Sequence, residues 1–174
     1  MKHNRSSPAY RVAFMGMLFA LALLLSWLEN MLPPAPFLPV GVKLGLSNII
    51  TMYALFFLGK PQAFAIAALK SMFVLLTSSL TTAAVSLSGG MLSLCVMLLL
   101  TLPKRWKPSY LILSIFGAVF HNIGQLAMVT LLLGTFSVAY YLPVLLVSGV
   151  GMGILTGLLL RVLLPALERI KPGR

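Results

Sequence analysis

Long apolar runs alternate with short polar segments along the chain. Six of these runs are predicted to cross a lipid bilayer as helices, and they cover residues 12–31, 42–58, 62–80, 89–102, 110–133 and 140–164. Between them lie segments rich in proline, glycine or hydroxyl residues, such as 33–39, 59–61 and 103–108. The pattern predicts an all-α integral membrane protein with six transmembrane helices.

The lysines and arginines lie almost entirely in alternate connections. With the N-terminus placed inside the cell, eleven cations fall on inner segments, Lys43 alone falls on an outer one, and Lys70 lies within the third run. This is the positive-inside pattern, so both termini are predicted to be cytoplasmic in a bacterial plasma membrane. The predicted division is a cytoplasmic tail over 1–11, a transmembrane domain over 12–165 and a basic cytoplasmic tail over 166–174.

Composition narrows the function. The chain has 174 residues, of which 60% are hydrophobic, and its only carboxylates are Glu29 and Glu168. Without aspartate it has no paired acids and no carboxylate site for magnesium, so we expect no catalysis by this chain alone, and no metal or cofactor. The net charge of +11 gathers in loops beside lipid rather than on a basic face, which argues against nucleic acid as a partner.

Small residues recur at helical spacing in two runs. The last run carries Gly149, Gly153 and Gly157. The first carries Ala13, Gly16 and Ala20. Rows of this kind let helix backbones approach closely. For the last run we predict packing within the chain, with a partner interface as the alternative. For the first run, internal packing and docking of a partner stay equally open.

Two lysines in or near the membrane are candidate functional residues, because a buried ammonium is costly. Lys43 precedes Asn48 at the outer end of the second run, where it either snorkels to the interface or serves a ligand. Lys70 lies about 12 Å of helix rise into the third run, so we predict an interior role for it.

Polar groups in two further runs complete the candidate site. His121, Asn122 and Gln125 lie near the middle of the fifth run, as an interhelical hydrogen-bond cluster or as cavity lining. Residues 86–90 are predicted to form an irregular helix entrance at the outer side. Either its free backbone N–H groups face an anionic ligand, or the segment simply returns the chain to the membrane. Ser88, Gly89 and Gly90 are its site residues.

These groups all fall in the outer half or the middle of the predicted bundle. Cationic and polar groups without matching acids suit an anionic or polar-headed small molecule, so we predict an outward-facing site with these ligand-binding residues: Lys43, Asn48, Ser88, Gly89, Gly90, His121 and Gln125. The rival explanation is an internal pair between Lys43 and Glu29.

Three segments, 41–49, 86–94 and 118–126, resemble the Gx transporter family, which is also called heptaprenyl diphosphate synthase component I. The resemblance extends from about residue 10 to 165. That family is similar to the substrate-binding S components of energy-coupling factor (ECF) vitamin transporters, which are six-helix bundles with an outward-facing ligand site. In those relatives small residues of the first span contact the coupling subunit, and here Ala13, Gly16 and Ala20 hold those positions.

The resemblance implies two functions. One is a solute-binding transport subunit that depends on a transmembrane coupling subunit and ATPases, since this chain has no Walker motif. The other is a non-catalytic accessory subunit for prenyl-diphosphate or quinone machinery or for flavin-linked extracellular electron transfer, with prenyltransferase or flavoprotein partners. An aspartate-rich prenyl synthase motif is absent from the sequence.

Overall fold

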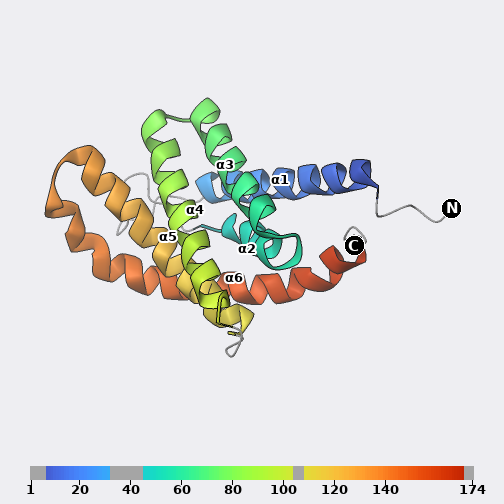
Figure 1. Cartoon of the computed structure of the whole chain (residues 1–174). Helices are drawn as coiled ribbons and strands as arrows, with labels where there is room; N and C mark the ends of the chain where they lie inside the picture. The colour runs from blue at the N-terminus through green and yellow to red at the C-terminus, as the bar shows by residue number, and fades with distance from the viewer. Residues whose placement is uncertain (1–6, 32–44, 104–107, 171–174) are drawn as a thin grey trace.

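The computed structural model describes residues 7–31, 45–103 and 108–170. Within these ranges the chain forms six α-helices and one short 3-10 helix and contains no strand, which confirms the all-helical prediction. In chain order the elements are α1 (Pro8–Met31), α2 (Asn48–Phe57), α3 (Lys60–Thr77), α4 (Leu80–Thr101), α5 (Tyr110–Leu133), η1 (Phe136–Tyr141) and α6 (Leu142–Ile170) (Figure 1).

The short helix α2 lies at the centre of the bundle. It packs against α1, α3, α4 and α6, and all its residues from 49 to 55 are buried. A helix that is apolar on every side needs neighbours on every side. Phe14 of α1, Ile66 of α3 and Leu160 of α6 supply them within one continuous core.

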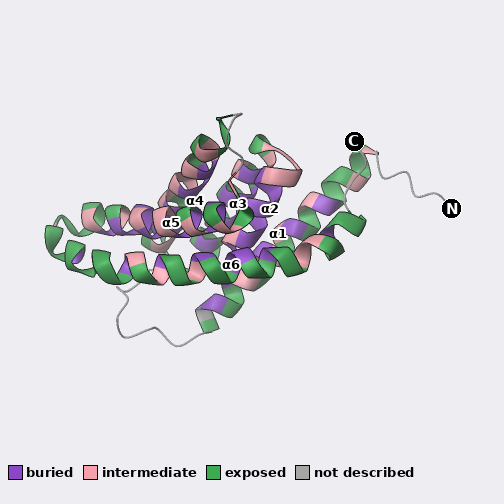
Figure 2. Ribbon diagram, turned by 90° about the horizontal axis from the view of Figure 1, so that it is seen from below, coloured by how far each residue is buried: buried purple, intermediate pink, exposed green. Residues whose placement is uncertain are grey.

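Helix α5 packs along both α4 and α6, while α1 and α6 form the margins of the bundle. Exposed residues run along α1 and α6 in Figure 2, and these are the least buried of the long apolar helices. The N-terminal end of α1 and the C-terminal end of α6 lie together, because the Tyr10 hydroxyl donates a 2.7 Å hydrogen bond to the carbonyl of Ile170. The two ends of the described chain are thus joined on one side of the molecule (Figure 1).

Within the described ranges, four stretches are long and apolar enough to cross a membrane: α1, α4, α5, and η1 together with α6. Helix α2 has 10 residues, or about 15 Å of rise, against a hydrocarbon core of about 30 Å. The expectation that residues 42–58 form a complete spanning helix is therefore wrong for the described part of that run. Gly45 has a φ of +90°, which lies outside regular helix geometry, so α2 cannot extend back through this residue.

The start of the fourth run was also predicted incorrectly. Helix α4 begins at Leu80 rather than Gly89, because Ser79 caps it by accepting a hydrogen bond from the N–H of Thr82 at 3.2 Å. Of the hydroxyls that resembled a connector, those of Thr81 and Thr82 pair with the capping Ser79, and that of Ser88 lies 3.0 Å from the carbonyl of Val85 in its own helix. The predicted helix entrance over 86–90 is consequently helix interior, with no free backbone N–H groups to offer an anion.

Other boundaries follow the sequence closely. Helix α5 covers the predicted residues 110–133, between the N-cap Ser109 and the left-handed Gly134. Helix α6 continues past the predicted end at 164, through Pro165, to Ile170.

Candidate functional site

Three neighbouring polar residues of α5 are buried in the bundle, but they do not act together. His121 and Gln125 are 2% and 1% exposed, and their Nε2 atoms lie 3.0 Å apart. An amide nitrogen only donates, so His121 Nε2 accepts and the ring proton is on Nδ1. That Nδ1 has no partner of full hydrogen-bond geometry among the described residues, but the ring interacts with the backbone of Gly89 in α4.

Asn122 points the other way, toward α6. Its Nδ2 donates to the carbonyl of Leu145 at 2.9 Å and to the hydroxyl of Ser148 at 3.4 Å. Asn122 therefore ties α5 to α6, while His121 and Gln125 face α2 and α4.

Gly89 and Ser88 bring α4 against this face of α5. A Cβ added at Gly89 would lie 2.8 Å from both Gln125 Cγ and the carbonyl oxygen of His121. The Ser88 hydroxyl lies 3.0 Å from the carbonyl of Gly124 as well as 3.0 Å from that of Val85, so the two carbonyls share its one proton. Gly90 is turned toward α3, where Ala67 is the nearest neighbour. Of the three predicted residues on α4, two thus form the wall beside His121 and Gln125 and one does not.

The N-terminal end of α2 closes the same space. A Cβ added at Gly45 would lie 2.9 Å from Asn48 Nδ2 and 3.3 Å from His121 Cδ2. Asn48 Nδ2 is buried and has no hydrogen-bond partner among the described residues. The structure therefore brings together Asn48, His121, Gln125 and Gly89, which are four of the residues that the sequence predicted for one site.

Charged groups surround the beginning of α2. The Lys70 ammonium, 3% exposed, donates to the hydroxyl of Ser47, the N-cap residue of α2, at 2.9 Å. It also interacts electrostatically with His121. A carboxylate oxygen of Glu29, 7% exposed, accepts a hydrogen bond from the backbone N–H of Gly45. Lys70 therefore lies in the interior of the bundle, where its charge at the positive end of a helix dipole is unfavourable.

Lys43 lies outside the described residues, so its predicted part in the site and its rival pairing with Glu29 both stay predictions. Glu29 itself has a defined contact on the other side of that segment, at Gly45.

A narrow space continues from Gly45 and Asn48 between α2, α4, α5 and α6, and its enclosed part has room for about one water molecule. Three hydroxyl residues line it, namely Ser93, Ser114 and Thr156. None of the three was predicted from the sequence. Each is a single hydroxyl within an apolar run, and a helical hydroxyl normally bonds to its own backbone, so nothing in the sequence marks them.

The family model described as Heptaprenyl diphosphate synthase component I matches residues 18–163. The chain belongs to this family. No curated protein and no solved structure matches it.

Membership of the heptaprenyl diphosphate synthase component I family agrees with the chemistry of the chain. The family name describes a component of a synthase, and a chain whose only carboxylates are Glu29 and Glu168 fits a non-catalytic component. In the described part of the chain, no three histidine, cysteine or acidic side chains gather as metal ligands.

The two rows of small residues in this family member have different surroundings. Gly149, Gly153 and Gly157 of α6 are buried and face the backbone of α5. Ala13, Gly16 and Ala20 of α1 are exposed, and no described atom lies within 4 Å of a Cβ added at Gly16. Within the described chain, the α1 row is not used for internal packing.

Proposed function

We propose that this protein is a membrane-embedded, substrate-binding subunit of a small-molecule transporter, similar to an ECF S component. Its ligand is an anionic or polar-headed small molecule. The observation that carries the proposal is the group of buried polar side chains where α2, α3, α4 and α5 meet. Membrane helices rarely bury such groups without a function, because each one costs free energy in a low-dielectric interior.

The chemistry of this group favours an electron-rich ligand. Asn48 Nδ2 is a buried donor without a hydrogen-bond partner among the described residues, and His121 Nδ1 has only its interaction with the backbone of Gly89. The Lys70 ammonium and the N-terminal end of α2 add positive potential beside them. Burying further donors next to a cation is unfavourable unless an acceptor joins them, so a carboxylate or phosphate is the natural headgroup. On this proposal Lys43 adds a second cation, and Ser88, Gly89 and Gln125 shape the wall, while Gly90 faces α3.

The proposed topology places both termini in the cytoplasm of a bacterial cell, with six helices inserted in the plasma membrane. Helix α2 then reaches only part of the way across, surrounded by protein rather than by lipid. Irregular backbone before α2 is compatible with a membrane because it faces buried polar groups.

Two matched positions test the orientation. Ser79 and Ser109 are both exposed N-cap residues, one before α4 and one before α5. In a Cys95→Ala background, Ser79→Cys is expected to react with a membrane-impermeant thiol reagent added to intact cells, and Ser109→Cys only after lysis. The reverse pattern would invert the topology.

The headgroup site is tested by Lys70→Met in the full-length protein. Small molecules retained after purification are released by denaturation and quantified by mass spectrometry. We expect an anionic compound that is present with wild type to be reduced at least tenfold, because the ammonium is lost. Ser71→Ala is the matched control, since this buried hydroxyl on the same helix bonds only to its own backbone, at Ala67. Equal retention in Lys70→Met and wild type would refute the site.

A second function is favoured by the family match itself. As a component of a heptaprenyl diphosphate synthase, the chain would be an accessory membrane subunit beside a catalytic prenyltransferase, or beside quinone- or flavin-linked machinery. Affinity purification from the native membrane separates the two. A coupling subunit with ATPases supports transport, whereas a prenyltransferase or flavoprotein supports the accessory function. In either case, Ala13, Gly16 and Ala20 form the proposed docking face for the partner.

A further inference from the structure

Two buried polar atoms at the contact between α2 and α4 have no hydrogen-bond partner among the described residues. They are Asn48 Nδ2, on the first residue of α2, and Ser93 Oγ, in the middle of α4. Both residues line the narrow space between α2, α4, α5 and α6. Because water satisfies such groups in the unfolded chain, folding without a partner for either atom is unfavourable.

This space has the size and the chemistry of a site for a single water molecule. Its enclosed part has room for about one water, and a buried water needs about two to four polar partners. Spaces that stay empty in protein interiors are lined by apolar groups. The wall here carries an amide and three hydroxyls instead.

The hydrogen-bonding capacity of the wall can be worked out atom by atom. Ser93 is fully buried, and its free hydroxyl can both donate and accept. Thr156 donates to the carbonyl of Gly153 at 3.1 Å, so Ser114 must donate to Thr156 in their short hydroxyl pair. Ser114 Oγ consequently keeps an acceptor position. The set of one donor, one acceptor and one hydroxyl that does both is complementary to water, which has two donors and two acceptor positions.

We propose that one ordered water molecule binds in this space and joins the first residue of α2 to α4 and α5. It accepts a hydrogen bond from Asn48 Nδ2 and donates to Ser93 Oγ and Ser114 Oγ. Helix α2 has only 10 residues, so a tie at its first residue fixes how it enters the bundle. The Asn48 amide has a second N–H, which the water would orient toward the headgroup, and this last step alone rests on the proposed function.

A sodium ion is the wrong occupant for this space. None of the described residues that line it carries a carboxylate. The Lys70 ammonium bonds to Ser47, the residue before Asn48, and would repel a cation. Asn48 Nδ2 is a donor and cannot coordinate one. A neutral water avoids both conflicts.

The site is tested directly in a structure of the full-length protein in lipid nanodiscs, at a resolution that shows ordered waters. A density peak is expected within hydrogen-bond distance of Asn48 Nδ2 and Ser93 Oγ, and it should remain in sodium-free buffer. An empty space in a map that shows other buried waters would overturn the site. Loss of the peak without sodium would overturn the choice of occupant.

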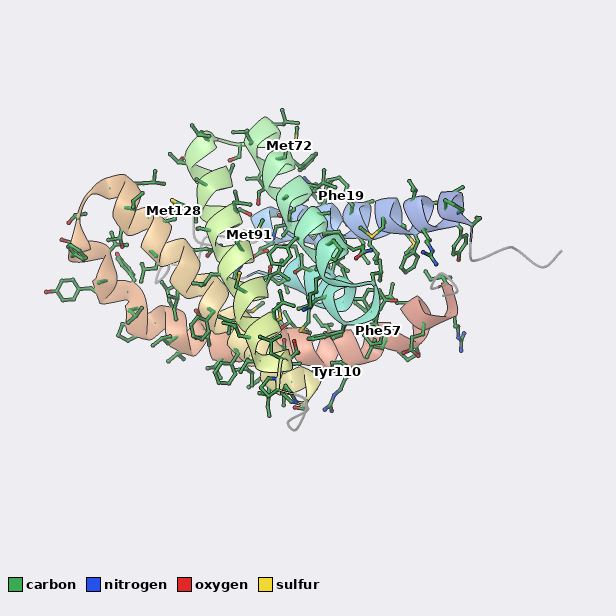
Figure 3. The ribbon with its side chains drawn as sticks, viewed as in Figure 1. Phe19, Phe57, Met72, Met91, Tyr110 and Met128 are labelled. Carbon is green, nitrogen blue, oxygen red and sulfur yellow. The ribbon has the colours of Figure 1, made fainter. Side chains whose placement is uncertain are left out.

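X-ray footprinting tests the site in solution, because an X-ray pulse converts bound water into hydroxyl radicals that oxidise neighbouring side chains. The Met97 thioether lines the space and is 2% exposed, so radicals from bulk water hardly reach it. Ser93→Ala should lower the rate of Met97 oxidation at least threefold, since it removes a partner of the water. Met72, which is 60% exposed on α3 (Figure 3), is the internal standard for the radical dose.

Ser71→Ala is the matched control and should leave the Met97 rate unchanged. Ser71 is also a buried serine, but its hydroxyl bonds to the carbonyl of Ala67 and it does not line the space. Ser93→Ala enlarges the space as well as removing a partner. An equal or faster rate in Ser93→Ala would therefore overturn the water site, because a larger space without bound water only admits more radicals.

Neither measurement involves Lys70. If the water is found while Lys70→Met retains the anionic compound, the headgroup site fails and the water site stands. If no water is found while Lys70→Met loses the compound, the water site alone is overturned.

Discussion

The rows of small residues on α6 and α1 have similar spacing in the sequence and opposite environments in the molecule. On α6, a Cβ added at Gly149 would lie 3.0 Å from Val119 Cα, and one at Gly153 would meet the backbone of Ile115. On α1, a Cβ added at Gly16 would meet no described atom within 4 Å. One row is an internal contact surface, and the other is a face that the described chain leaves uncovered.

This difference shows how much a spacing of four residues reveals about helix packing. It places side chains on one face of a helix, but it does not say whether another helix covers that face. On α6 the cover is α5, which packs along it. Helix α1 packs on α2 and α3 through Phe14, Leu18 and Ala22, so its small residues point away from the bundle.

Gly153→Ala should cause the largest loss. Its Cβ would collide with the backbone of Ile115, which cannot rotate aside as a side chain can, so α5 and α6 must move apart. Overpacking of this kind costs about 1–3 kcal/mol of unfolding free energy. Thermal unfolding in detergent measures it, with Gly151→Ala on the same helix as the control. Equal melting temperatures for these two variants would show that the packing of α6 on α5 is incorrect.

Gly149→Ala and Gly157→Ala should have intermediate and ordered effects. At Gly149 the nearest atom is the Cα of Val119, whereas at Gly157 it is the Cδ1 of Leu111, at 3.1 Å. A leucine tip can shift and a backbone atom cannot, so Gly149→Ala should be the more destabilising of the two. We expect melting temperatures to fall in the order 151, 157, 149 and 153. A larger loss at 157 than at 149 would contradict the contacts that set this order.

Much of the fold follows from sequence, and α5 shows why. A capping serine at 109, a predominantly apolar run and a glycine at 134 define both ends, and the predicted and observed bounds agree. The start of α4 was missed for a physical reason. Hydroxyls and paired glycines favour turns in water, but Ser88 bonds to its own helix and Gly89 provides room for α5. Local composition does not contain that tertiary contact.

The residues of the candidate site likewise divide into those that can be recognised from the sequence and those that cannot. Asn48, His121 and Gln125 are recognisable because amides and imidazoles are unusual in membrane helices, and the structure brings them together. Ser93 and Ser114 are not recognisable, since their significance depends on where neighbouring helices leave space. The function of Asn122 as a tie to α6 likewise depends on the position of the carbonyl of Leu145.

The smallest effect on stability is expected for Gly16→Leu. The added side chain would extend into open space, so the free energy of unfolding of the isolated protein should change by no more than about 0.5 kcal/mol. The melting temperature should shift correspondingly little. Its effect should instead appear in the membrane, where a bulky residue between Ala13 and Ala20 would prevent close approach of a partner helix. Co-purification of the partner should be lost.

Gly151→Leu is the matched control, because Gly151 of α6 is also exposed and also has no described atom within 4 Å of an added Cβ. If both variants keep the partner, the α1 row faces lipid. If Gly16→Leu unfolds the isolated protein and Gly151→Leu does not, then α1 packs through this row, and the contrast between the two rows is incorrect.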